Sequence, residues 1–177
     1  LQTPPAAGPQ TPMQGIVCEN MHSVRLSAAG DFKVDFISIF GEFSQKLAKT
    51  GRGGTLRPHP GGQYFLKKNV PVGDNVEMDV NPIYRIDLSR FAYGVSAPSS
   101  VLIDMAISGT PAAVWRDAED RMDADAYGGL ETVRSLEDWL DFAKRAETDR
   151  EGFQKREGAF LAEERLVLDP AEAHRRF

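Results

Sequence analysis

The stretch VSAPSSVLIDMAISGTPAAVW, residues 95–115, decides the fold that this sequence predicts. An apolar strand ends near Ser96, a helix follows over residues 99–108, and a second apolar strand follows over residues 111–116. Gly109 is placed to end the helix, because glycine readily adopts the left-handed backbone of a helix C-cap. A strand, a helix and a strand in this order predict a right-handed crossover between two parallel strands.

The same alternation continues on both sides of this stretch. Short strands are predicted over residues 15–20, 55–60, 75–80, 92–97 and 130–133. Helices are predicted over residues 32–47, 62–69 and 82–91, and from residue 136 onward behind a Ser135 and Asp138 start signal. Strands and helices that alternate in this way favour a mostly parallel sheet with helices on both faces. We therefore expect an α/β, Rossmann-like three-layer α/β/α domain with about five or six strands.

The length of 177 residues, 41% of them hydrophobic, is sufficient for one domain with a real core. Residues 1–14 contain four prolines and few apolar side chains, which is typical of a linker. We expect the Rossmann-like domain over residues 15–146 and a C-terminal helical extension over residues 147–177. Because the sequence opens on a linker without an initiator methionine, we also expect it to be the C-terminal part of a larger protein.

The composition narrows the class of protein. A net charge of −5 and a pI near 5.3 argue against a nucleic-acid binder, which has to neutralise many phosphates. The single cysteine, Cys18, cannot form an internal disulfide and reads as a buried thiol in a reducing compartment. No stretch approaches the ~20 apolar residues of a membrane span, and the start lacks the regions of a signal peptide. We expect a cytoplasmic protein, peripheral at most at the inner face of the membrane.

Polar residues follow three of the predicted strands. The carboxyl ends of parallel strands meet at one edge of the sheet, where ligands of such folds bind. We therefore expect a single crevice lined by residues at the ends of three different strands: Ser96, Ser99 and Ser100, then Arg57 and His59, then His22 and Arg25.

These residue types suit an anionic ligand. Ser99 and Ser100 begin a helix, where free N–H groups and hydroxyls bind an anion, although a serine there is also an ordinary N-cap. Arg57 offers a planar fork that suits phosphate, and His59 between two prolines could bind a ligand or hold its own loop. Asp104, one turn into the helix, could accept hydrogen bonds from ribose or sugar hydroxyls, pair with a basic group, or face solvent.

A metal site is not expected. Asp123 and Asp125 form a DAD sequence, a short acidic pattern of a kind that can hold a divalent metal. Here the two aspartates lie in a loop rich in acids, so we predict neither a metal nor another cofactor.

The segments LRPHPGG and FAYGVSAPSSVLIDMAISGTPAAVW together resemble the C-terminal, donor-binding half of a GT-B glycosyltransferase. The resemblance is greatest to bacterial surface-polysaccharide glycosyltransferases and to the glycerophosphotransferases of teichoic acid synthesis. Those enzymes carry HP after a strand and a helix of the form SS-x-x-x-[ED]-x-x-x-x-G-x-P. Here the pattern falls on Ser99, Ser100, Asp104, Gly109 and Pro111, and the resemblance covers about residues 15–146.

The resemblance implies that His59 and the serines contact the phosphates of the donor, and Asp104 the ribose of its nucleotide. The donor would be a CMP-, CDP- or UDP-linked group, with cytidine favoured, and the acceptor a glycan. Two departures matter: the acid is usually glutamate, and the N-terminal Rossmann-like domain, which normally carries the acceptor site and often the base, is not in this sequence. An upstream domain is therefore an expected partner.

The sequence thus predicts a glycosyltransferase domain that binds a nucleotide-activated sugar donor for bacterial polysaccharide synthesis, with Arg57 and His59 as its catalytic residues. Three alternatives stay open: a CDP-glycerol-type glycerophosphotransferase, half of a sugar-nucleotide epimerase, and a non-catalytic module that binds nucleotide sugars.

Overall fold

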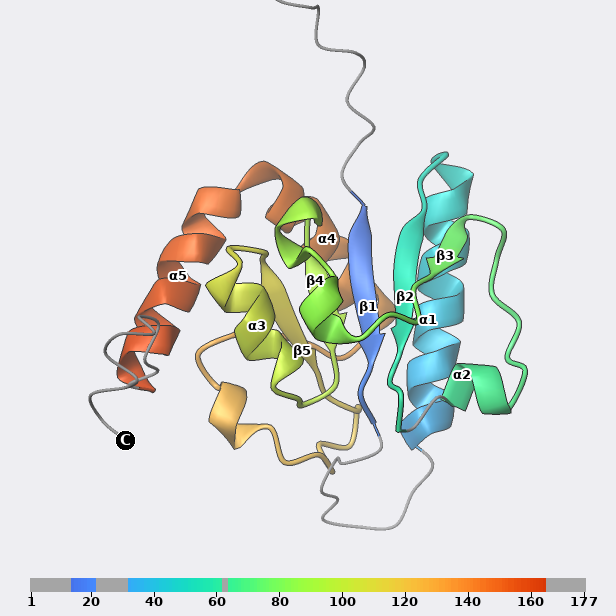
Figure 1. The fold of residues 1–177 in the computed structure, drawn as a ribbon, viewed down its shortest axis with the longest axis horizontal. Helices are drawn as coiled ribbons and strands as arrows, with labels where there is room; N and C mark the ends of the chain where they lie inside the picture. The colour runs from blue at the N-terminus through green and yellow to red at the C-terminus, as the bar shows by residue number, and fades with distance from the viewer. Residues whose placement is uncertain (1–13, 22–31, 62–63, 165–177) are drawn as a thin grey trace, which may run out of the picture.

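A computed structural model describes residues 14–21, 32–61 and 64–164 (Figure 1). Its centre is a six-stranded sheet in the order β3-β2-β1-β4-β5-β6, and every neighbouring pair of strands is parallel. The strands are β1 (Gly15–Glu19), β2 (Gly54–Pro58), β3 (Val76–Met78), β4 (Gly94–Ser96), β5 (Ala112–Trp115) and β6 (Glu131–Val133). The expected α/β fold with a mostly parallel sheet is confirmed.

Helices cover both faces of this sheet (Figure 1). Five α-helices lie within the described residues: α1 (Phe32–Lys49), α2 (Tyr64–Lys67), α3 (Val101–Ile107), α4 (Leu136–Thr148) and α5 (Arg150–Glu163). The same part of the chain contains three short 3₁₀ turns: η1 (Ile83–Arg85), η2 (Leu88–Arg90) and η3 (Asp125–Tyr127). Buried side chains of α1 and α4 form the core on one face, and those of α3 and the end of α5 form the core on the other.

Aromatic side chains fix α1 and α4 against the sheet. The ring of Phe36 meets Trp115 of β5 edge-on at 5.0 Å between ring centroids, and Trp139 of α4 at 5.6 Å. All three side chains are fully buried, and such pairs add to the free energy gained from their burial. The helical spacing of apolar residues after Phe32 predicted this buried face in part: Phe40, Phe43 and Leu47 are buried, but Val34, which the spacing included, is exposed.

On the other face, α3 packs directly on β4. A Cβ at Gly94 would lie 2.4 Å from the Met105 sulfur, so only glycine allows this approach. Gly109 then ends α3 with a left-handed backbone at φ 68°, as the sequence predicted. This close packing sets where α3 begins, and so where Ser99 and Ser100 lie relative to the sheet.

Three sequence predictions differ from the structure. Residues 82–91 form two 3₁₀ turns instead of one helix, because the side chain of Asp87 accepts a hydrogen bond from Ser89 N and starts a new turn there. The helix expected over residues 62–69 is described only as the single turn of α2. The helix that the Ser135 and Asp138 capping box opens is also not continuous, since Asp149 leaves the helical backbone and caps α5 through Gly152 N.

None of the helices among the described residues is long and apolar enough to cross a membrane. Residues 1–13 of the predicted linker lie outside the described residues.

Candidate functional site

The strand order of the sheet reverses between β1 and β4, and a polar pair joins the two strands there. The side-chain amide of Asn20, directly after β1, donates a hydrogen bond from Nδ2 to Ser96 Oγ at the end of β4, 3.3 Å away. Ser96 Oγ in turn donates to the carbonyl of Ala97 at 2.8 Å. In parallel α/β sheets, ligands bind at the carboxyl edge where the order reverses. The predicted Ser96 thus lies at this point, but its hydroxyl is buried and used internally.

Arg57 is a buried cation at the same edge. In the sheet register, Cys18 of β1 lies opposite Arg57 on β2 and opposite Ser96 on β4. Only 4% of Arg57 is exposed, and the one hydrogen bond that its side chain makes within the described residues runs from Nε to Asn81 O at 3.3 Å. No described carboxylate forms a salt bridge with it. Asp79 follows Met78 of β3, the residue opposite Leu56, but no salt bridge joins it to Arg57. A buried guanidinium without a salt bridge is costly, which favours an anion arriving from outside.

Cys18 itself is the inert buried thiol that the sequence predicted. It is fully buried, and burial raises its pKa to about 12, although the positive charge of Arg57 acts in the opposite direction. A thiol with so high a pKa is not a nucleophile at neutral pH.

His59 follows β2 and extends the pairing of the strands. Its backbone N–H donates to Glu19 O at 3.1 Å, and its Nδ1 accepts a hydrogen bond from Gly61 N at 2.9 Å. The second bond stabilises the loop around His59. Holding its own loop was one of the two roles that the sequence left open for this residue. Because Nδ1 accepts, the neutral ring carries its proton on Nε2, which is the donor that a phosphate oxygen would require.

Glu19 ties this edge to α2. Its buried carboxylate accepts a hydrogen bond from Phe65 N at 3.1 Å and another from Tyr64 N. A carboxylate at the first N–H groups of a helix is favourable, and here it holds the far end of the His59 loop. The sequence did not indicate this residue, because it stands in an apolar run that reads as core.

Neither of the two serines before α3 acts as a strong cap. Ser100 occupies the N-cap position, but its side chain makes no capping hydrogen bond, and its side chain is exposed. Ser99 Oγ accepts only a long bond of 3.5 Å from Val101 N. The ordinary capping role therefore accounts for little of this pair, and both hydroxyls lie at the carboxyl edge beside the end of β4.

Asp104 lies in a hollow of about 400 Å³ between α3 and the 3₁₀ turns. The other lining residues are mostly apolar: Ile83, Tyr84, Ile86, Leu88, Ile107 and Ser108. Partial burial raises the pKa of Asp104 above its usual range, and no described basic group pairs with it. Tyr84 is 81% exposed beside it. An acceptor next to an exposed aromatic ring suits a nucleoside, with hydroxyls on the carboxylate and a base on the ring.

Two of the predicted site residues are not described by the structure, and the two aspartates of the DAD sequence lie in a separate loop. His22 and Arg25 lie outside the described residues. Asp123 and Asp125 are exposed, and Asp123 Oδ1 accepts a bond from Asp125 N at 3.4 Å. No group of three or more metal-ligating side chains is found in residues 14–21, 32–61 and 64–164.

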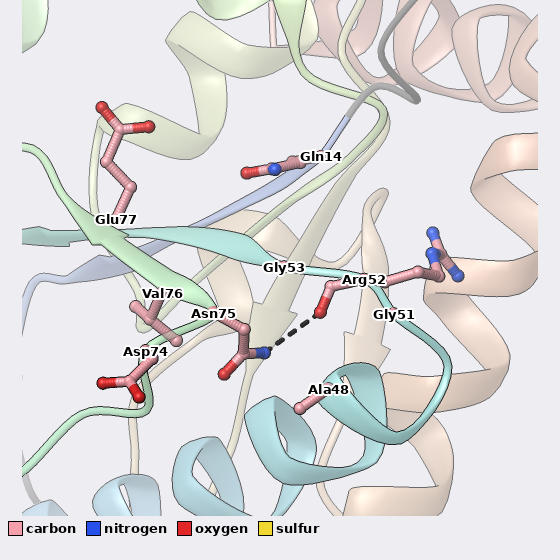
Figure 2. A pocket seen from close by; sticks show the side chains of 9 residues that line it. All are labelled: Gln14, Ala48, Gly51, Arg52, Gly53, Asp74, Asn75, Val76 and Glu77. Atoms are coloured by element: carbon pink, nitrogen blue, oxygen red, sulfur yellow. Dashed lines mark hydrogen bonds between the residues drawn. The ribbon is translucent and has the colours of Figure 1, made fainter.

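A second hollow, of about 550 Å³, lies at the opposite, amino edge of the sheet (Figure 2). Its wall includes Arg52 and Asn75, and the side chain of Asn75 donates to Arg52 O at 3.1 Å and to Ser44 O at 2.9 Å. Arg52 is also paired with Glu147. These hydrogen bonds hold the end of α1 and the start of β3, so the polar groups here have structural partners that Arg57 lacks.

Solved structures that share this fold include two glycosyltransferases. The glycotransferase of kitacinnamycin is 15% identical, with a TM-score of 0.51, over 90% of this chain and 43% of that chain. CalG4, the calicheamicin glycosyltransferase, is 14% identical, with a TM-score of 0.51, over 90% of this chain and 41% of that chain. No family model and no curated protein matches the sequence. The chain spans less than half of either enzyme, and what it shares with them is the Rossmann-like α/β fold.

Proposed function

We propose that this domain binds the nucleotide-activated sugar donor of a glycosyltransferase that builds bacterial surface polysaccharide. The observation that carries the proposal is Arg57, a buried guanidinium without a salt bridge in the described chain, at the carboxyl edge beside the reversal of strand order. A donor phosphate would supply the missing anion. A glycerophosphate carried by CDP would satisfy the same residues, so a CDP-glycerol-type transfer belongs to the same proposal.

The donor would extend along α3. Its phosphates would lie near Arg57, His59, Ser99 and Ser100 at the sheet edge, and its nucleoside would enter the hollow that holds Asp104. The backbone of α3 links the two parts, since Asp104 N donates to Ser100 O one turn away. This arrangement gives the phosphates donors and the ribose an acceptor, which is the chemistry that each part requires.

With CDP-glycerol, the acceptor hydroxyl would attack the phosphorus next to glycerol, and CMP would leave. With a sugar donor, the chemistry would be displacement at the sugar. An acceptor hydroxyl attacks the donor carbon, the bond from that carbon to a phosphate oxygen breaks, and the electron pair stays on the leaving nucleotide. The guanidinium of Arg57 and the N–H of His59 would stabilise the charge that develops on this phosphate. The hydroxyl proton would pass to a base on the upstream domain, together with which this domain would form the complete active site.

Calorimetric titration with CMP, CDP, UDP and GDP tests the proposal. We expect one nucleotide to bind best, with cytidine favoured, and Arg57→Met to weaken it by about 1.5–3 kcal/mol, the range for a hydrogen bond to a charged group. Arg52→Met is the matched control, because Arg52 stands at the other end of β2 and lines the hollow at the amino edge. It should leave the affinity unchanged.

The measured affinities distinguish the proposed donor site from the alternatives. Loss of affinity in Arg52→Met with none in Arg57→Met would move the binding site to the amino edge and contradict the proposal. Nucleotide binding without transfer, even when the upstream domain is supplied, would indicate the non-catalytic module. The absence of binding to all four nucleotides by a folded protein would overturn the proposed donor site.

A further inference from the structure

We infer that Asn20, which no sequence pattern indicated, contacts the group that the donor transfers, through a hydrogen bond from a hydroxyl of that group to Asn20 Oδ1. The inference rests on the proposed function and names a further specificity-determining residue of the same site. It depends on where Asn20 lies, on which of its atoms are already bonded, and on what its neighbours require.

Asn20 occupies the centre of the carboxyl edge. On one side, the bond from His59 N to Glu19 O continues the pairing of β1 with β2, which brings His59 alongside Asn20. On the other side, the bond from Asn20 Nδ2 to Ser96 Oγ reaches the end of β4, and Ser99 follows three residues later. The residue therefore stands between the two groups that would hold the donor phosphates.

The hydrogen bonds of this pair determine which atom of Asn20 remains unpaired. Ser96 Oγ donates its proton to Ala97 O, so it accepts from Asn20, and the nitrogen of the carboxamide must face it. The other atom, Oδ1, is buried and has no hydrogen-bond partner in the described structure, and Asn20 is only 1% exposed. Buried side-chain oxygens in folded proteins almost always have a donor, so this one calls for a donor from outside.

The neighbouring groups define the chemistry of the ligand. Arg57 makes no salt bridge with a described carboxylate and Asn20 Oδ1 lacks a donor, on the same face and at the same edge of the sheet. A free phosphate at neutral pH offers acceptors almost exclusively, and a nucleobase in the hollow of Asp104 would be one turn of α3 away. A polyhydroxy group esterified to phosphate offers both: an anionic oxygen for Arg57 and a hydroxyl proton for Asn20. The carboxamide would have to turn, or the chain around it open, to admit that hydroxyl.

Two ligand pairs and two leucine variants test this inference. The ligands are CDP with CDP-glycerol and UDP with UDP-glucose, titrated into the parent protein and into Asn20→Leu, which keeps the volume and removes the acceptor. For the pair whose nucleotide the parent binds, we expect Asn20→Leu to weaken the binding of the polyhydroxy donor about tenfold, the usual size for one hydrogen bond. The affinity for the nucleotide alone should change less than about twofold.

Asn75→Leu is the matched control, because Asn75 at the amino edge makes two structural hydrogen bonds. It should lower the melting temperature and leave all the affinities unchanged, whereas Asn20→Leu should keep the melting temperature of the unliganded protein. A lower melting temperature with unchanged binding in Asn20→Leu would make Asn20 structural and overturn the inference. An equal loss for nucleotide and donor would place the contact on the nucleotide and overturn it too. If the parent binds neither pair, the proposed function fails, and the inference with it.

Discussion

The carboxylate of Glu157 on α5 accepts a hydrogen bond from the backbone N–H of Ala112 at the start of β5, 2.6 Å away. Its other oxygen, Oε2, is buried and has no partner in the described structure. Burial raises the pKa of Glu157 from 4.5 to about 7, although the Ala112 N–H and the charges of Arg156 and Arg150 act in the opposite direction. This carboxyl joins the C-terminal helix to the sheet that carries the proposed donor site.

Glu157 should make the protein less stable as the pH rises. A pKa raised in the folded state means that the folded protein holds its proton more tightly, so the stabilisation is complete below pH 4.5 and is lost as the pH rises to about 7. The difference between these two pKa values corresponds to about 3 kcal/mol of unfolding free energy. Glu157→Gln keeps the acceptor for Ala112 N and removes the titration. We expect the variant to gain stability over the parent by about that amount between pH 4.5 and pH 8.

Urea unfolding at several pH values measures this difference. Glu151→Gln, an exposed change on the same helix, is the control and should show no such trend. A constant difference between parent and Glu157→Gln across the pH range would mean that Glu157 does not titrate between the two states.

The contact of Glu19 with α2 predicts a link between stability and the His59 loop. Glu19→Gln leaves one oxygen for two backbone donors, so one buried N–H loses its partner. We expect the free energy of unfolding to fall by about 1–3 kcal/mol and amide exchange of α2 to rise. Glu77→Gln, an exposed change on β3, should do neither. Unchanged exchange at residues 64–67 would show that the carboxylate does not hold α2.

Asp104 should make the site prefer ribonucleotides. If its carboxylate accepts hydrogen bonds from both ribose hydroxyls, a nucleotide without the 2′ hydroxyl loses one bond to a charged group, about 1.5–3 kcal/mol. We expect CDP to bind more tightly than 2′-deoxy-CDP, and Asp104→Ala to abolish the difference. Asp125→Ala, an exposed change away from the hollow, should preserve it. Equal affinity of the parent for the two nucleotides would remove Asp104 from the ribose.

Arg57 and His59 should make donor binding independent of a divalent metal. In the proposed site the positive charge of Arg57 and the N–H groups of both residues contact the phosphates directly. We therefore expect EDTA to leave the calorimetric affinity for the preferred nucleotide unchanged. A loss that magnesium restores would contradict this, and Asp123→Ala with Asp125→Ala would then show whether the acidic loop holds the ion.

The fold could be predicted because its signals are local. The apolar run at β1, the spacing of aromatic residues in α1, Gly109 after α3 and the capping box at Ser135 each act within a few residues. The failures have local causes as well. Residues 82–91 contain regularly spaced apolar side chains, but the turn at Asp87 breaks the helix that this spacing predicts.

The site could be predicted only in part, because a side chain's role depends on partners far away in the sequence. Arg57 and His59 could be assigned to the sheet edge, since they lie at the end of a predicted strand. The unpaired state of Asn20 Oδ1 could not, because it follows from a bond to Ser96, 76 residues further along the chain. Asn20 and Ser96 lie next to each other because β1 and β4 are neighbours in the sheet. No local sequence pattern predicts that strand order.

Substituting the two serines before α3 distinguishes ligand binding from helix capping, because the first role affects nucleotide affinity and the second affects stability. Ser100 makes no capping bond and Ser99 makes only a long one, so Ser99→Ala with Ser100→Ala should cost little stability. If the hydroxyls bind the donor phosphates, the same double variant should weaken the preferred nucleotide by about 1–3 kcal/mol. Ser135→Ala is the matched control, because Ser135 caps α4 through Asp138 N at 3.2 Å. It should lose about 1 kcal/mol of unfolding free energy and keep its full affinity. Urea unfolding and calorimetry on both variants decide the matter: a double variant that loses stability and binds normally would make the two serines an ordinary helix start.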